Sequence, residues 1–355
     1  MFWVTTLLML GLISCSSPRN PETTTFPTNT AFPFSQEESS NLGLNKREID
    51  TLLSLQQVND YPLYVMDYSA NYRDLIAFNL IDQLEEKTSA VKPWGCSLYA
   101  SFKDDENMLY GRNFDWGYSP ALLLYTDPPF GYASASMVDI SYLGYRQDNV
   151  MGLDQANLED RLALLASPSI PFDGINEKGL VVGMAAIPGS NPIRENTKPT
   201  LDSLGMIRVL LDHASNVAEA VALFQSYNIH FGVGPSLHYL IADASGQAAL
   251  VEYYHSEMYI TYNQNPWHLA TNFIIETTEG SPEGYCNRYD TLHERLLNSQ
   301  GMLSSKEAIQ LLEDVSAENT QWSVLYNFSN GDIKVVMGRD YDTIEEFQLV
   351  SLDHP

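Results

Sequence analysis

Two short apolar runs separated by a charged turn occupy residues 94–116. The second run ends in the sequence Gly-Arg-Asn-Phe-Asp-Trp. Two such runs joined by a polar turn predict a β-hairpin. The hairpin places Cys96 at the start of its first strand and Arg112 and Asp115 at the end of its second. We therefore expect a thiol, a guanidinium and a carboxylate at one edge of a sheet.

Apolar runs of strand length recur along the rest of the chain. Strands are expected over 121–126, 133–140, 180–187, 258–262 and 267–271, further hairpins over 238–254 and 322–338, and helices over 202–226, 286–299 and 305–316. The last helix opens with a capping box formed by Ser304 and Glu307. The polar, glycine-containing segment 172–179 is expected to be a turn. Hairpins interrupted by groups of helices indicate an α+β fold, with antiparallel sheets covered by helices.

The N-terminus has the pattern of an export signal. An apolar run at residues 7–13 is too short to span a bilayer. It leads into Leu-Ile-Ser-Cys, ending at Cys15, which resembles a bacterial lipobox, in which the cysteine is lipidated. We interpret residues 1–15 as a signal peptide and Cys15 as the lipid-anchored residue. No Lys or Arg precedes the apolar run, which departs from the usual pattern of such signals. The alternative is an ordinary secretory signal cut nearby.

The composition changes twice after this signal. Residues 16–45 are rich in Ser, Thr, Pro and Asn and predict a disordered tether. Apolar residues at helical spacing follow in 46–58 and 72–86. We interpret these two helices as a prosegment packed beside the strand of Cys96, the alternative being that they form the first layer of the domain. The chain is thus divided into a signal (1–15), a tether (16–45), a helical prosegment (46–95) and a catalytic domain (96–355).

Composition restricts the class of partner. The chain has 355 residues, of which 44% are hydrophobic, so it can bury a large core. It carries 45 acidic and 19 basic residues, a net charge of −26, which argues against nucleic acid and anionic membrane surfaces as partners. Its three cysteines, Cys15, Cys96 and Cys286, are too few for a disulfide framework. The sequence has no CxxC or His-rich metal spacing, and no metal or cofactor is expected.

The chemistry of Cys96 can be argued from its neighbours. A free thiol has a pKa of about 8.5, and a guanidinium such as Arg112 lowers it by favouring the thiolate. None of the seven histidines shows a local context typical of a cysteine protease. If the Gly95–Cys96 bond is cut, the new α-amine, with a pKa of about 7.7–8.0, can act as the base. Asp115 can then orient it. The alternative is a buried structural thiol.

Five segments occur in the order seen in one enzyme family. They are Gly95-Cys96, 111–116 (GRNFDW), 173–180 (DGINEKGL), Thr271-Asn272 and 286–289 (CNRY). Together they resemble the linear-amide N-terminal nucleophile hydrolases. These include choloylglycine (bile salt) hydrolases, penicillin V acylases, acid ceramidase, N-acylethanolamine acid amidase and the acyl-CoA:6-aminopenicillanic acid acyltransferase group. The resemblance implies a four-layer αββα sandwich and extends from residue 94 to about residue 350.

The resemblance also implies roles for single residues. Cys96 would be the nucleophile and, after autoproteolysis, would supply the α-amine base. Arg112 would stabilise the thiolate and place the acyl group, and Asp115 would hydrogen-bond the α-amine.

The oxyanion hole, in the same family, would be formed by Asn272 with a backbone N–H and Asn176. For Asn176 a turn between strands is the alternative explanation. Arg288 would hold the charge network of the site.

The length of chain before Cys96 departs from one branch of this family. In bile salt hydrolases only an initiator methionine precedes the cysteine, whereas here about 80 residues separate Cys15 from Cys96. This arrangement is closer to the acid-ceramidase-like and acyltransferase groups and implies a precursor cut at Gly95–Cys96. We expect an exported, lipid-anchored amidase that hydrolyses a small N-acyl amide through a thioester. The alternatives are an acyltransferase using the same thioester and a lipoprotein that binds such a ligand without turnover.

Overall fold

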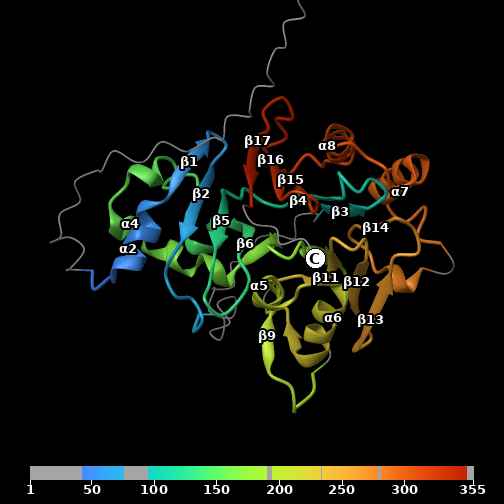
Figure 1. The fold of residues 1–355 in the computed structure, drawn as a ribbon, viewed down its shortest axis with the longest axis horizontal. Helices are drawn as coiled ribbons and strands as arrows, with labels where there is room; N and C mark the ends of the chain where they lie inside the picture. Colours follow the sequence, from blue (N-terminus) through green and yellow to red (C-terminus); the bar gives the residue numbers. More distant parts are fainter. Residues whose placement is uncertain (1–41, 76–94, 190–193, 233, 279–280, 350–355) are drawn as a thin grey trace, which may run out of the picture.

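The computed structural model describes residues 42–75, 95–189, 194–232, 234–278 and 281–349 (Figure 1). Cys15, the expected signal and most of the expected tether lie outside these residues. So does most of the second expected prosegment helix. Among the described residues, no helix is long and apolar enough to cross a membrane.

Most strands belong to two large sheets. In sheet order, the nine-stranded sheet contains β1 (Gln56–Asn59), β2 (Leu63–Tyr68), β5 (Ala121–Thr126), β6 (Ser134–Asp139), β7 (Pro171–Asn176), β8 (Val181–Ile187), β11 (Ser236–Ala242), β12 (Ala248–Tyr254) and β13 (Glu257–Tyr262). The six-stranded sheet contains β14 (Trp267–Ala270), β3 (Gly95–Ser101), β4 (Leu109–Asp115), β15 (Thr320–Asn327), β16 (Asp332–Met337) and β17 (Glu345–Gln348). A separate parallel pair is formed by β9 (Thr200–Asp202) and β10 (Asn228–His230).

Helices cover the outer face of each sheet (Figure 1). The nine-stranded sheet is covered by α5 (Ser203–His213) and α6 (Val217–Ser226), and the six-stranded sheet by α7 (Asn287–Ser299) and α8 (Ser305–Asp314). The short helices are α2 (Lys46–Leu53), α4 (Leu158–Arg161) and the 3₁₀ turns η2 (Ile140–Leu143), η3 (Leu153–Gln155), η4 (Leu162–Ser169) and η5 (Ile275–Thr277). The four layers confirm the expected αββα sandwich.

The two sheets pack closely where β3 faces β8. Both strands are buried along their whole length, which is why their sequences are nearly continuous apolar runs. A Cβ atom at Gly183 of β8 would lie 2.7 Å from the Tyr110 hydroxyl of the facing sheet. Glycine at this position therefore lets the two sheets approach closely beside Leu98 and Arg112.

Two expectations differ from the structure. The first expected prosegment helix ends at Leu53, and residues 56–59 form β1, which with β2 joins the nine-stranded sheet. The segment 172–179 is not a single turn, because β7 runs through it to Asn176. Both segments are short, so residues brought from elsewhere in the chain determine their conformation more than local propensity does.

Candidate active site

The expected hairpin is present and aligns the site residues. β3 and β4 are antiparallel, with Gly95 opposite Asp115, Cys96 opposite Phe114 and Leu98 opposite Arg112. Because side chains alternate along a strand, Cys96 and Arg112 share one face and Asp115 lies on the other. The Cys96 side chain therefore faces the nine-stranded sheet, while its backbone is flanked by residues from the helical side.

The backbone of Cys96 is held on both sides. Its N–H donates to Oδ1 of Asn272 at 2.6 Å, and its carbonyl accepts from Nη1 of Arg288 at 2.6 Å. Arg288 also donates to Oδ1 of Asn272 at 2.8 Å, and Asn272 Nδ2 donates to the Ala186 carbonyl at 2.7 Å. Asn272 follows β14, which pairs with β3. Asn272 and Arg288, which lie far from Cys96 in sequence, thus hold the two peptide groups on either side of its Cα atom.

Asp115 lies against the peptide before the cysteine. Its Oδ1 accepts from the Thr320 hydroxyl at 2.5 Å, and its Oδ2 lies 3.5 Å from Arg288 Nη1. Oδ2 has no hydrogen-bond partner among the described residues. Burial raises the pKa of Asp115 to about 6, although Thr320 and Arg288 oppose the rise. A carboxyl group with this pKa can exchange a proton near neutral pH.

Arg112 provides positive charge on the thiol side. It is fully buried and forms an ion pair with Asp173 of β7, whose carboxylate also accepts from the Tyr326 hydroxyl. Burial raises the pKa of the Cys96 thiol, and Arg112 opposes this rise by favouring the thiolate. Within the described part of the chain, Nε and Nη2 of Arg112 have no hydrogen-bond partner.

The structure does not place Asn176 in this group. Its Nδ2 donates to the carbonyls of Leu211 and Ala214, and its Oδ1 accepts from the backbone amides of Lys178 and Leu180. Both amide hydrogens are therefore used, and none remains for an oxyanion. The expected oxyanion role of Asn176 is wrong, and the alternative, a residue that organises the turn after β7, is what the structure shows.

Sequence reasoning missed three residues that support the site. Asp173 opens the segment 173–180 and was available as a signal, but no role was expected for it. Thr320 and Tyr326 carry no signal, because they reach the site only through the pairing of β15 with β4.

Cys286 precedes α7 as a half-buried free thiol. Among the described residues, no group of three His, Cys, Asp or Glu side chains could hold a metal ion.

Comparison with known proteins identifies the family. The model of the acyl-coenzyme A:6-aminopenicillanic acid acyltransferase family matches residues 102–339, about two thirds of the chain. The chain belongs to this family. The match begins after Cys96 and includes Arg112, Asp115, Asn272 and Arg288. The resemblance drawn from the sequence motifs is thereby confirmed. A search of curated proteins finds no match.

Solved structures also match this chain. A mutant of conjugated bile acid hydrolase from Clostridium perfringens matches with a TM-score of 0.51 at 15% identity, covering 72% of this chain and 92% of that chain. Penicillin V acylase from Agrobacterium tumefaciens has a TM-score of 0.47 at 14% identity, covering 72% and 92%. The first likeness, together with the four layers, shows that this acyltransferase-family member has the N-terminal nucleophile hydrolase fold.

Proposed function

We propose that the protein is an amidase that cuts its own Gly95–Cys96 bond and then hydrolyses a small linear N-acyl amide through a Cys96 thioester. The observation that carries this proposal is the hydrogen bond of 2.6 Å from the Cys96 N–H to Asn272. The nitrogen that must become the base already has an acceptor in the uncut chain. A cut at this bond frees the amine without moving its partner.

The processing step uses groups already in contact. The Cys96 sulfur attacks the Gly95 carbonyl carbon, the new S–C bond replaces the C–N bond, and the thiol proton ends on the leaving nitrogen. Water then hydrolyses the resulting thioester and releases the Gly95 carboxylate. Asp115 supports the proton transfer, since its carboxylate lies beside Gly95 and its pKa is about 6. Arg288 holds the Cys96 carbonyl during the reaction.

Turnover repeats the same chemistry on an external amide. The α-amine of Cys96 accepts the thiol proton, and the thiolate, stabilised by Arg112, attacks the substrate carbonyl. Asn272 donates one amide hydrogen to Ala186, so the other remains for the oxyanion. A donor in this position typically contributes about 3–4 kcal/mol to transition-state stabilisation. The amine product leaves with the proton, and water releases the acid.

Acyl transfer is a second candidate function, favoured by the family match. In that reaction an amine replaces water in the last step, and every earlier step is unchanged. A lipoprotein that binds its ligand without turnover is disfavoured, because Cys96, Arg112, Asp115, Asn272 and Arg288 are all present. We also propose that the protein is exported and anchored to a membrane through lipidated Cys15.

The test compares intact masses of the purified wild type, Cys96→Ala and Cys286→Ala. We expect the wild type and Cys286→Ala to split between Gly95 and Cys96, and Cys96→Ala to stay whole. The matched control shows that loss of a thiol elsewhere has no effect. A wild type that stays whole and lacks amidase activity would overturn the mechanism. The mass of the N-terminal fragment, with or without acyl chains on Cys15, tests the anchor.

A further inference from the structure

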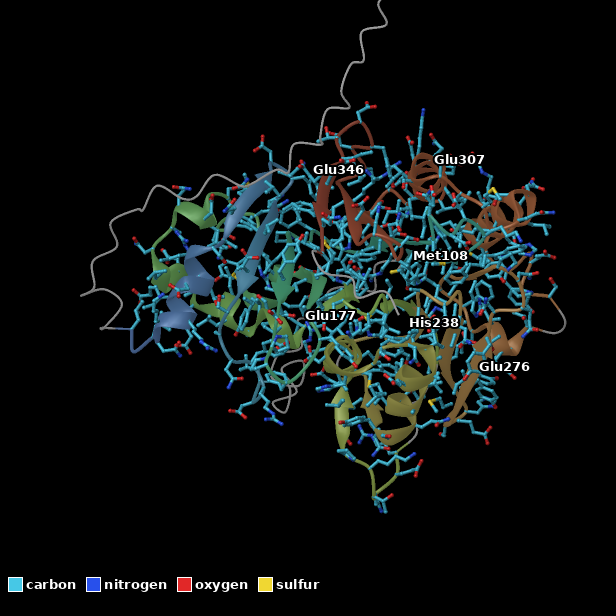
Figure 2. The ribbon with its side chains drawn as sticks, viewed as in Figure 1. Met108, Glu177, His238, Glu276, Glu307 and Glu346 are labelled. Atoms are coloured by element: carbon cyan, nitrogen blue, oxygen red, sulfur yellow. The ribbon has the colours of Figure 1, made fainter. Side chains whose placement is uncertain are left out.

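A buried histidine–glutamate pair lies behind the segment that carries Asn272. His238 is on β11 and Glu252 on the adjacent strand β12, and both are fully buried. Nδ1 of His238 lies 2.9 Å from Oε1 of Glu252. Figure 2 labels His238 and Glu276 in the part of the molecule where Figure 1 shows β11–β13. None of the catalytic steps above uses this pair.

Glu252 binds the backbone of the segment that follows Asn272. Its Oε1 accepts from the Ile275 N–H and its Oε2 from the Glu276 N–H, both at 3.0 Å. These amides belong to η5, which begins three residues after Asn272. Burial alone would raise the pKa of Glu252, but the bonds from His238 and the two amides outweigh it, so this pKa lies below its usual value. Glu252 is thus a buried anion that is stabilised by the two backbone amides of η5 and by His238.

The segment 271–274 is consequently fixed at both ends. On one side β14 pairs with β3, with Ala270 opposite Leu98. On the other side Glu252 holds the start of η5. Between these anchors, Asn272 must present Oδ1 to Cys96 and keep one amide hydrogen for the oxyanion. A shift of about 1 Å in such a group can cost about a hundredfold in rate.

A purely structural role for the pair is the alternative. A buried carboxylate carries a desolvation penalty of several kcal/mol, so it needs specific partners. The ladder between β11 and β12 is built from backbone hydrogen bonds and does not require Glu252. Apart from His238, the hydrogen bonds that Glu252 accepts all come from η5. The carboxylate therefore stabilises the position of η5 and is not needed for the pairing of β11 with β12.

We propose that Glu252, held in place by His238, is a positioning residue for Asn272 in both self-cleavage and turnover. The inference rests on the proposed function of Cys96. Glu252, which does not contact Cys96, then determines where the oxyanion donor Asn272 lies.

The experiment measures the rate of self-cleavage in the full chain, since that reaction needs no identified substrate. In Glu252→Gln one carboxylate oxygen becomes an NH₂ group. One backbone amide of η5 therefore loses its acceptor, while the side-chain volume is kept. We expect cleavage to slow by about 10–100-fold. The matched control is Asp243→Asn, a buried carboxylate that holds Val217 N–H at the start of α6. We expect it to lower the melting temperature comparably and to cleave within about twofold of wild type.

A second variant avoids the buried carboxylate altogether. Ile275→Pro removes one donor to Glu252, and proline is tolerated at the first position of a helical turn. Ile274, with φ −81° and ψ 112°, already has the conformation that a following proline requires. We expect the same slowing as in Glu252→Gln, and this variant decides the question if Glu252→Gln fails to fold.

The outcomes separate the two proposals. Wild-type cleavage with slow Glu252→Gln and Ile275→Pro supports both. Cleavage of both variants at the wild-type rate overturns the positioning role and leaves the proposed function intact. Equal slowing in Asp243→Asn also overturns it, because the effect would then follow from stability alone. An uncut wild type overturns the proposed function and the inference together.

Discussion

Gly95 has too little room for a side chain. A Cβ atom here would lie 2.9 Å from Asp115 Oδ2 and 3.5 Å from Arg288 Cζ. Both neighbours are held by other bonds, Asp115 by Thr320 and Arg288 by Cys96 and Asn272. A side chain at residue 95 would therefore displace the groups that surround the Gly95–Cys96 bond, where we propose the cut.

We expect Gly95→Ala to slow self-cleavage by on the order of tenfold, because about 1.4 kcal/mol of misplacement is enough for that effect. The rate is measured from the appearance of the fragment that begins at Cys96. Gly117→Ala is the matched control, since a Cβ atom at Gly117 would meet nothing within 4 Å. Once cut, the Gly95→Ala enzyme should turn over at the wild-type rate, as residue 95 is no longer bonded to Cys96. Cleavage as fast as in the control would contradict the steric argument.

The site residues differ in how far the sequence could reveal them. Cys96, Arg112 and Asp115 lie in one hairpin, so local pattern and register bring them together. Asn272 is placed by contacts with segments far away in sequence, and only the order of motifs indicated it. Asn176 was misassigned because a motif asparagine looks available, whereas its amide is used by backbone groups of α5 and the turn after β7.

Helices and strands, like the site residues, were predictable from the sequence where neighbouring residues determine them. The hairpins β3–β4 and β11–β12 and the capping box of α8 were predictable, because neighbouring residues determine them. β7 was not, since its polar residues Asp173 and Asn176 suggest a turn, and their partners come from β4, β15 and α5. The order of strands in the sheets could not be predicted from the sequence either, because it depends on pairings between strands that are far apart in the chain.

At the scale of elements, β2 joins the expected prosegment (46–95) to the rest of the chain. β2 pairs in parallel with β5 over six residues, from Leu63 opposite Ala121 to Tyr68 opposite Thr126. Leu63, Tyr64 and Met66 are fully buried there. Burying each such side chain contributes about 1.5–3 kcal/mol, so a cut at Gly95 leaves a large docked surface.

We expect the two fragments of the cut protein to elute together in gel filtration and to separate only in denaturant. Uncut Cys96→Ala protein gives the reference volume, because its fragments are covalently joined. An N-terminal fragment that elutes separately under native conditions would show that β2 does not hold the prosegment. In that case the nine-stranded sheet would have β5 at its edge after processing.

At the scale of the whole molecule, the ion pair between Arg112 and Asp173 joins the two sheets. Arg112 belongs to β4 of the six-stranded sheet and Asp173 to β7 of the nine-stranded sheet. Tyr326 of β15 donates to the same carboxylate. Both charges are fully buried. The charge that favours the Cys96 thiolate is therefore also a link between the halves of the sandwich.

Neutralising one partner should consequently destabilise the entire fold. We expect Asp173→Asn to lower the free energy of unfolding by about 3–5 kcal/mol, because Arg112 would remain charged and buried without its counterion. Tyr326→Phe is the matched control, as it removes one hydrogen bond to the same carboxylate but keeps the ion pair, and should cost about 1.5–3 kcal/mol. Urea unfolding of both variants is measured in the Cys96→Ala background, where we expect every chain to be uncut. If Asp173→Asn is no less stable than Tyr326→Phe, the ion pair does not hold the sheets together, and Arg112 must be kept in place by its packing against Phe114 instead.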